Sequence, residues 1–194
     1  DAAAFTNLTG DHLDYHLTLD HYRQSKARLF SSLKPDGVAV IVGDDESAHI
    51  MIDACTDGAK VIRCGPESTK DAWVRIEEES IEGTLAVIHT PSGDFQTRIP
   101  MFGAYNALNT LQSLLMAEAI LTRLGVPTDE QRAAFEKSLL RLKLPMGRLE
   151  HCETSEDDIT VLVDFAHTDD ALRSALSGVQ RVLPEGAKLW CVFG

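Results

Sequence analysis

The sequence predicts an α/β fold with a parallel sheet, a small antiparallel sheet and the start of a second α/β domain. Apolar runs alternate with helical segments between residues 25 and 65, and apolar and polar residues alternate over residues 73–101. A further strand–helix–strand pattern occupies residues 159–194. Parallel strands need long connections, so alternating strands and helices are typical of parallel sheets. Since 44% of the 194 residues are hydrophobic, the chain can fill a sizeable core.

The expected parallel sheet is built from short apolar strands. Residues 1–5 resemble the end of a strand that enters a loop, and residues 21–33 have the three- and four-residue apolar spacing of a helix. The run at 38–43 is continuously apolar, which is typical of a strand buried on both faces. A helix with acidic residues at its start is expected over 44–55, and a second strand over 59–65.

The middle of the chain predicts three antiparallel strands followed by two helices. Turn sequences EGT and PSGD divide the alternating segment at residues 73–101. The segment at 104–125 has the apolar periodicity of a long helix. Thr128 and Gln131 match a T-x-x-Q capping box, which predicts that a further helix begins there and continues to Leu140.

A linker is expected where proline and glycine interrupt the sequence RLKLPMGRLEHCE. This places a first domain at residues 1–144, a linker at 145–153 and the start of a second domain at 154–194. The second domain would begin with a β-α-β unit formed by the segments ITVLVDFA, TDDALRSALSGVQRVL and KLWCVFG. Both ends of the chain fall next to predicted strands, so we expect a piece of a longer protein.

Composition excludes several classes of protein. The formal net charge is −12, which leaves little surplus to build the basic face of a nucleic-acid-binding protein. No apolar run approaches the roughly 18 residues needed to span a bilayer, and no secretion signal is present. The four cysteines are scattered without a C-x-x-C pair, which suits a reducing compartment rather than a zinc site. We therefore expect a cytoplasmic protein.

The motif DHLDYH and the lysine that follows it are candidates for a metal site. His12 lies in this cluster of histidines and aspartates, which are common ligands of divalent ions. A helix-capping turn with solvated histidines explains the same pattern. Lys26 lies on a partly apolar helix face, where a lysine usually extends its ammonium group to solvent. As a neutral amine it could instead react with carbon dioxide and give a carbamate ligand.

Two motifs in the second half could bind a nucleotide. Asn106 and Asn109 in GAYNALN share one face of a helix start, and an asparagine can pair with an adenine edge. A helix start that simply favours asparagine is the alternative. Arg148 follows Gly147 in the expected linker, where it could meet a phosphate between domains or be an ordinary surface arginine.

The motif VDFAHTDDAL joins a strand to a helix. Asp164 ends the predicted strand, and His167 and Thr168 follow in the loop before the helix. Ligand sites of open α/β sheets lie at such strand ends. A capped strand–helix junction, with Thr168 as N-cap, is the alternative.

Taken in order, these motifs resemble the Mur ligases of peptidoglycan synthesis. The segments that carry the resemblance are NLTGDHLDYH, HYRQSKARLF, GAYNALN, GRLE, VDFAHTDDAL and LWCVFG. The resemblance implies the second half of a central ATPase domain and the first β-α-β unit of a Rossmann-like C-terminal domain. It also implies that the family's phosphate-binding loop lies before Asp1, so this chain alone would be inactive.

The resemblance also implies roles for individual residues. Lys26 would be carbamylated and, together with His12, would hold a magnesium ion. The remaining residues would contact ATP, with Asn106 near the adenine and the others at the closing domains: Arg148, Asp164, His167 and Thr168.

The implied activity is an ATP-dependent ligase reaction with an acyl-phosphate intermediate. It would add the third peptide residue, diaminopimelate or lysine, to UDP-N-acetylmuramoyl-L-alanyl-D-glutamate. The sequence leaves three alternatives open: a cyanophycin synthetase, a folylpolyglutamate synthetase type of ligase, and a homologue without catalytic activity.

Overall fold

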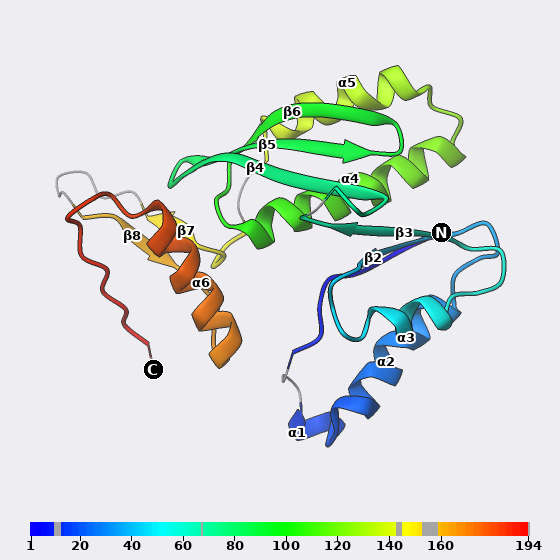
Figure 1. Cartoon of the computed structure of the whole chain (residues 1–194), viewed down its shortest axis with the longest axis horizontal. Helices are drawn as coiled ribbons and strands as arrows, with labels where there is room; N and C mark the ends of the chain where they lie inside the picture. The colour runs from blue at the N-terminus through cyan, green and yellow to red at the C-terminus, as the bar shows by residue number, and fades with distance from the viewer. Residues whose placement is uncertain (10–12, 67, 143–144, 153–158, 194) are drawn as a thin grey trace.

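The main body of the protein is one six-stranded sheet with helices on both faces (Figure 1). The computed structural model describes residues 1–9, 13–66, 68–142, 145–152 and 159–193. The strands lie in chain order across the sheet. Their bounds are β1 (Ala2–Phe5), β2 (Val38–Val42), β3 (Lys60–Gly65), β4 (Ala72–Ser80), β5 (Gly83–Thr90) and β6 (Gly93–Ile99).

The predicted parallel and antiparallel strands are confirmed, and they form a single mixed sheet. Strands β1 to β4 pair parallel with one another, whereas β5 pairs antiparallel with both β4 and β6. The two halves meet where Cys64 pairs with Ala72 and Gly65 with Trp73. This short ladder makes the antiparallel strands an extension of the parallel sheet.

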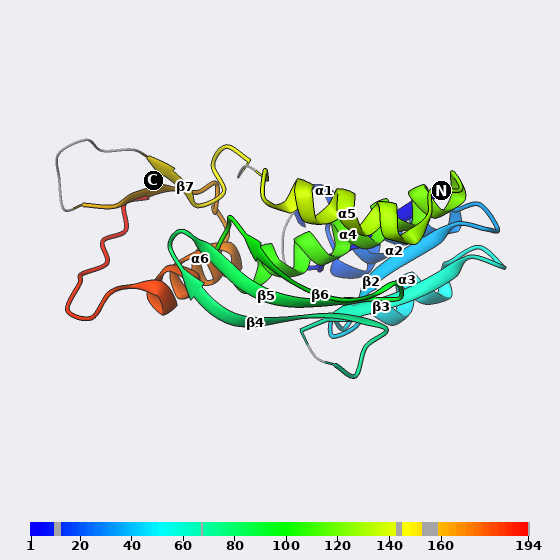
Figure 2. The ribbon, with the colours of Figure 1, turned by 90° about the horizontal axis from the view of Figure 1, so that it is seen from above.

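Helices cover both faces of the sheet (Figure 2). Helix α4 (Ala104–Arg123) contacts strands of both halves on one face, and α5 (Thr128–Leu139) packs against α4 and β6. The opposite face of the parallel half carries α2 (Leu19–Ser31) and α3 (Ala48–Asp53), and the short α1 (Leu13–His16) precedes α2. Among the described helices, none is long and apolar enough to cross a membrane.

Strand β2 is buried on both faces, as its unbroken apolar run predicts. Val40 and Val42 join the core beneath α4, whereas Ala39 and Ile41 join the core beneath α2 and α3. Alternate side chains of a strand point to opposite faces. The sheet therefore separates two hydrophobic cores.

The predicted capping box of α5 is wrong. Pro127 is the N-cap residue, and no side chain caps the helix there. The amide of Gln131 instead donates hydrogen bonds to the carbonyl oxygen of Val126 at 2.8 Å and to the hydroxyl of Thr122 at 3.2 Å. Gln131 is therefore used to join the end of α4 to the start of α5.

The C-terminal part differs from the expected β-α-β unit. Strand β7 (Glu150–Cys152) falls within the expected linker and pairs antiparallel with β8 (Val161–Val163). Helix α6 (Asp169–Val182) follows as predicted. Residues 188–193 form no strand (Figure 1). Trp190 and Val192 are exposed. A strand requires a neighbour for its backbone hydrogen bonds, and no described strand pairs with this segment.

Candidate functional site

Three of the predicted site residues meet where the six-stranded sheet joins the C-terminal part. Asn106 lies in the first turn of α4, Arg148 precedes β7, and Asp164 follows β8. Tyr105 lies among them, next to Asn106 in the chain and packed against the apolar group of Phe102, Leu149 and Val179. We call this group of four residues the junction cluster.

Asn106 is buried, and its side chain supports the start of α4. The side-chain amide donates a hydrogen bond of 2.7 Å to the carbonyl oxygen of Phe102, and the residue is 8% exposed. Its backbone amide donates to the carbonyl oxygen of Gly103. Asn109, three residues later, is exposed. The helix-start interpretation is thus confirmed for Asn106, and contact with an adenine stays a prediction.

Asp164 joins the segment before β7 to the end of β8. Its carboxylate accepts hydrogen bonds from the backbone amides of Leu149 at 2.8 Å and Ala166 at 2.7 Å. Leu149 is buried and has a φ of +49°, so this carboxylate holds a left-handed turn in place. The neighbouring Arg148 is exposed, which leaves its guanidinium group accessible to an anionic ligand.

Gly147 allows the same turn to approach Phe165 closely. A Cβ atom at Gly147 would lie 2.4 Å from Cδ2 of Phe165, and the glycine has a φ of +67°. The carbonyl oxygen of Gly147 accepts a hydrogen bond from the backbone amide of Phe165 at 2.8 Å. A side chain at this position would therefore force the turn and the segment after β8 apart.

We expect Gly147→Ala to lower the free energy of unfolding by about 2 kcal/mol, through backbone strain and overlap with Phe165. Gly186→Ala is the matched control, because Gly186 has a φ of +81° but a Cβ atom there would meet nothing within 4 Å. Urea denaturation of both variants separates the two causes. Equal losses would show that packing against Phe165 contributes nothing.

The loop after β8 caps α6. The hydroxyl of Thr168 accepts a hydrogen bond from the backbone amide of Ala171 at 3.3 Å, which confirms Thr168 as the N-cap residue. His167 is exposed, and its Nδ1 lies 2.8 Å from the carbonyl oxygen of Phe165, to which it can donate. Contacts of His167 and Thr168 with a nucleotide stay predictions.

Lys26 belongs to a second cluster, on α2. Its Nζ lies 5.0 Å from the ring centroid of Tyr22, and the side chain is half-buried. The ring of Tyr22 stacks on that of His16, with 4.7 Å between the centroids. Nδ1 of His16 in turn lies 3.3 Å from Nδ1 of His21. The structure thus places Lys26 at the end of a row of aromatic side chains from two helices.

This second cluster does not by itself build a magnesium site. His12 lies outside the described residues, and within the described ranges no three His, Cys, Asp or Glu side chains gather to hold a metal ion. An ammonium group at Lys26 would repel a cation, so the side chain fits a metal only as a carbamate. Magnesium binding by His12 and Lys26 therefore stays a prediction.

Tyr105 is a member of the junction cluster that sequence reasoning missed. Burial and the negative charge of Asp164 raise the pKa of Tyr105 to about 12, against the opposing effects of Asn106, Arg148 and Arg181. Its place beside Asn106 in GAYNALN is the signal that could have identified it. Arg181, in the last turn of α6, was also missed.

We expect the stability of the protein to fall as the pH rises from about 10 to about 12, partly because of Tyr105. At lower pH the phenol is protonated in both the folded and unfolded states; between the two pKa values only the unfolded state releases the proton. Tyr105→Phe should reduce the fall in the free energy of unfolding between about pH 10 and pH 12, whereas Tyr15→Phe, at an exposed ring, should not. Urea unfolding at several alkaline pH values measures how the free energy of unfolding depends on pH. The same pH dependence in both variants would contradict the assignment of this effect to Tyr105.

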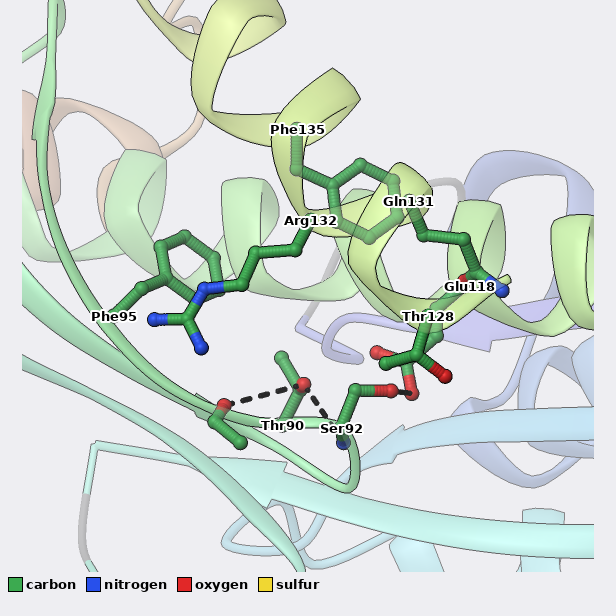
Figure 3. A pocket seen from close by; sticks show the side chains of 9 residues that line it. Thr90, Ser92, Phe95, Glu118, Thr128, Gln131, Arg132 and Phe135 are labelled. Atoms are coloured by element: carbon green, nitrogen blue, oxygen red, sulfur yellow. Dashed lines mark hydrogen bonds between the residues drawn. The ribbon is translucent and has the colours of Figure 1, made fainter. Parts of the chain in front are cut away.

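Two of the cavities lined by described residues lie outside the junction cluster. One, between the β5–β6 turn and α5, has a volume of about 20 Å³, enough for about one water molecule (Figure 3). There the hydroxyl of Ser92 donates a 2.6 Å hydrogen bond to Glu118. The other, of about 450 Å³, lies beyond the ends of β2 and β3 and is lined by His49, Arg63 and Lys70, among others. The residues that line these cavities include none of the predicted site residues.

Comparison with known proteins places the chain in a family. Residues 1–117 match the model of the Mur ligase middle domain, and residues 147–194 match the Mur ligase, glutamate ligase domain. The protein named UDP-N-acetylmuramoyl-L-alanyl-D-glutamate–2,6-diaminopimelate ligase is 34% identical to this chain in Chlorobaculum tepidum and 38% identical in Neisseria meningitidis serogroup B. Each match covers 100% of this chain and 38% of the relative, so the chain spans well under half of those proteins.

Solved structures agree with this placement. A structure of UDP-N-acetylmuramoyl-L-alanyl-D-glutamate–2,6-diaminopimelate ligase is 30% identical, with a TM-score of 0.73 over 95% of this chain and 36% of that one. MurF from Acinetobacter baumannii has a TM-score of 0.74 over 93% of this chain and 37% of its own, but is 20% identical and shows the fold alone. The chain belongs to the Mur ligase family.

Proposed function

We propose that the whole protein is an ATP-dependent ligase that adds diaminopimelate to UDP-N-acetylmuramoyl-L-alanyl-D-glutamate. The observation that carries this proposal is identity of 34% and 38%, over the full length of the chain, to two relatives named for that reaction. The domain division at 1–144, 145–153 and 154–194 is part of the proposal. The likeness to folylpolyglutamate synthetase structures rests on 18% identity, so it does not support a folate substrate.

The proposed reaction proceeds through an acyl phosphate. The free carboxylate of the UDP-linked dipeptide attacks the γ-phosphorus of ATP and releases ADP. The amine of the incoming amino acid then attacks the acyl carbon, loses a proton and expels phosphate as the amide forms. The protein supplies alignment and charge stabilisation rather than a covalent intermediate.

The junction cluster supports a nucleotide site between the two parts of the chain. Arg148 is exposed at the turn that Asp164 holds, so a guanidinium group is presented where an anionic phosphate could enter. Asn106 is fixed by its bond to Phe102 and lies beside Tyr105, and we propose that it faces the adenine. Arg148, Asp164, His167 and Thr168 would contact ATP when the domains close.

The second cluster would serve the metal. We propose that Lys26, as a carbamate, and His12 hold Mg²⁺. When bound, the ion would offset the negative charge of the phosphates, a demand that is acute in a chain with net charge −12. Lys26 lies half-buried beside Tyr22, and its side chain would carry the negative charge of a metal ligand only as a carbamate.

The decisive test is ADP release by the whole protein. UDP-N-acetylmuramoyl-L-alanyl-D-glutamate, ATP and Mg²⁺ are supplied with diaminopimelate or with lysine in separate reactions. We expect turnover with diaminopimelate, and turnover with lysine alone would correct the substrate. Absence of turnover with both would favour a cyanophycin type of substrate or a homologue without activity. The 194-residue chain alone should be inactive, since its sequence contains no G-x-x-x-x-G-K-[ST] phosphate loop.

A further inference from the structure

We propose that Glu79 is a positioning residue that ties the first turn of α4 to α6. Through this tie, docking of the C-terminal part would set the geometry of Asn106 and hence the affinity for the nucleotide. The inference rests on the proposed function, because it assigns Asn106 to a nucleotide site.

The carboxylate of Glu79 joins two parts of the chain that are far apart in sequence. Its Oε1 accepts a hydrogen bond of 2.7 Å from the backbone amide of Gly103, and its Oε2 accepts one of 3.2 Å from Nε of Arg181. The side chain of Glu79 is 11% exposed and that of Arg181 is 50% exposed. One carboxylate thus contacts the family's middle domain and the α6 helix of its C-terminal domain at once.

A β-bulge directs Glu79 to this position. In β4, Val74 and Ile76 face the core beneath α4, so regular alternation would turn Glu78 to the same face. The register shifts between Ile76 and Glu78, so that Glu79 pairs with the buried Thr84. Paired residues point to the same face of a sheet. Bulges commonly redirect a side chain next to a functional site.

Glu79 takes the place of a capping residue for α4. The N-cap residue is Gly103, which has a φ of +99° and no side chain to accept a hydrogen bond. The start of a helix has unpaired amides and favours a negative charge. The carbonyl oxygen of Gly103 accepts the backbone amide of Asn106, so a shift of Gly103 is passed directly to Asn106.

Apolar packing surrounds the ion pair and distinguishes it from an isolated surface pair. Phe102, Leu149 and Val179 are buried against one another and come from the α4 start, the turn before β7 and α6. Exposed ion pairs contribute little because water screens them and both side chains remain mobile. Here the low exposure of Glu79 and the neighbouring apolar cluster limit both the screening by water and the mobility of the side chains.

A double-mutant cycle in the whole protein tests the tie. Glu79→Gln retains an oxygen for Gly103 but loses the charge that faces Arg181, and Arg181→Met removes the other partner. We expect each variant to raise the KM for ATP roughly fivefold with a smaller change in kcat, and the double variant to match either single one. Arg181→Lys should restore part of the affinity.

Glu79 and Arg181 each have a matched control residue on the same strand or helix. Glu78 is exposed on the same strand, and Arg173 pairs with Asp169 on the exposed side of α6. Glu78→Gln and Arg173→Met should leave the KM unchanged. An unchanged KM in Glu79→Gln and Arg181→Met, or fully additive effects in the double variant, would overturn the proposal.

Amide hydrogen exchange gives a readout that does not depend on turnover. Arg181→Met should accelerate exchange of the peptide that contains Gly103 and Asn106 severalfold, although the substitution lies on α6. Unchanged exchange there would refute the tie even in an inactive protein. Accelerated exchange without ADP release by the wild type would leave the tie standing and reject the ligase assignment instead.

Discussion

Lys26→Ala is expected to reduce turnover of the whole protein at least about 100-fold, the size seen when one group that stabilises developing charge is lost. The proposed carbamate would place a negative charge next to the metal and phosphates, and alanine supplies none. Added acetate or formate should restore part of the activity, because a small carboxylate can occupy the vacated space. ADP release with and without acetate measures both effects.

Two further variants test whether Lys26 supports turnover as a carbamate or through its positive charge. Lys26→Arg keeps the positive charge and the contact with the Tyr22 ring but cannot form a stable carbamate. It should therefore be as inactive as Lys26→Ala. Lys34→Ala, at an exposed lysine paired with Asp1, serves as the control and should be fully active. Full activity of Lys26→Arg would rule out the carbamate.

Asp164→Ala is expected to lower the free energy of unfolding by about 2 kcal/mol and to raise the KM for ATP. Two backbone amides, of Leu149 and Ala166, lose their acceptor, and each such loss costs roughly 1 kcal/mol where water can partly replace it. The left-handed turn at Leu149 then loosens, and Arg148 moves with it. Urea denaturation and initial rates at varied ATP concentration measure the two effects.

Asp164→Asn is the informative companion variant. Its one amide oxygen can serve Leu149 or Ala166 but not both, so the loss of stability should be about half that of Asp164→Ala. Asp169→Ala, at an exposed acid in the first turn of α6, should cost less than about 0.5 kcal/mol. If Asp164→Ala were no more harmful than Asp169→Ala, the proposed role of Asp164 in holding the turn would be wrong.

The core strands and long helices could be predicted from the sequence because their signals are local. The apolar run of β2 and the alternation of β5 and β6 reflect which faces are buried. The expected helix at 44–55 forms over Ala48–Asp53 alone. Asp45 instead accepts hydrogen bonds from the backbone amides of Leu8 and Ser47, a tertiary use that local periodicity does not report.

The site was predicted as separate motifs, and its assembly depended on tertiary contacts. Asn106, Arg148 and Asp164 came from motif order, and the structure adds Tyr105 as the residue on which their effects converge. Glu79 could not be chosen from three successive glutamates, because the bulge that selects it is a property of strand pairing. His12 lies outside the described residues, so its position stays a prediction.

The mixed sheet has a further consequence for the order in which the chain folds. The β4–β5 and β5–β6 hairpins close at neighbouring pairs, Ser80 with Gly83 and Thr90 with Gly93. By contrast, Ala2 must find Val38 across a whole helical crossover. Pairings between residues that are distant in sequence lose more conformational entropy when the loop between them closes, and they form later. We therefore expect the antiparallel half to form early as a template for α4, and the parallel half that carries Lys26 to be completed last.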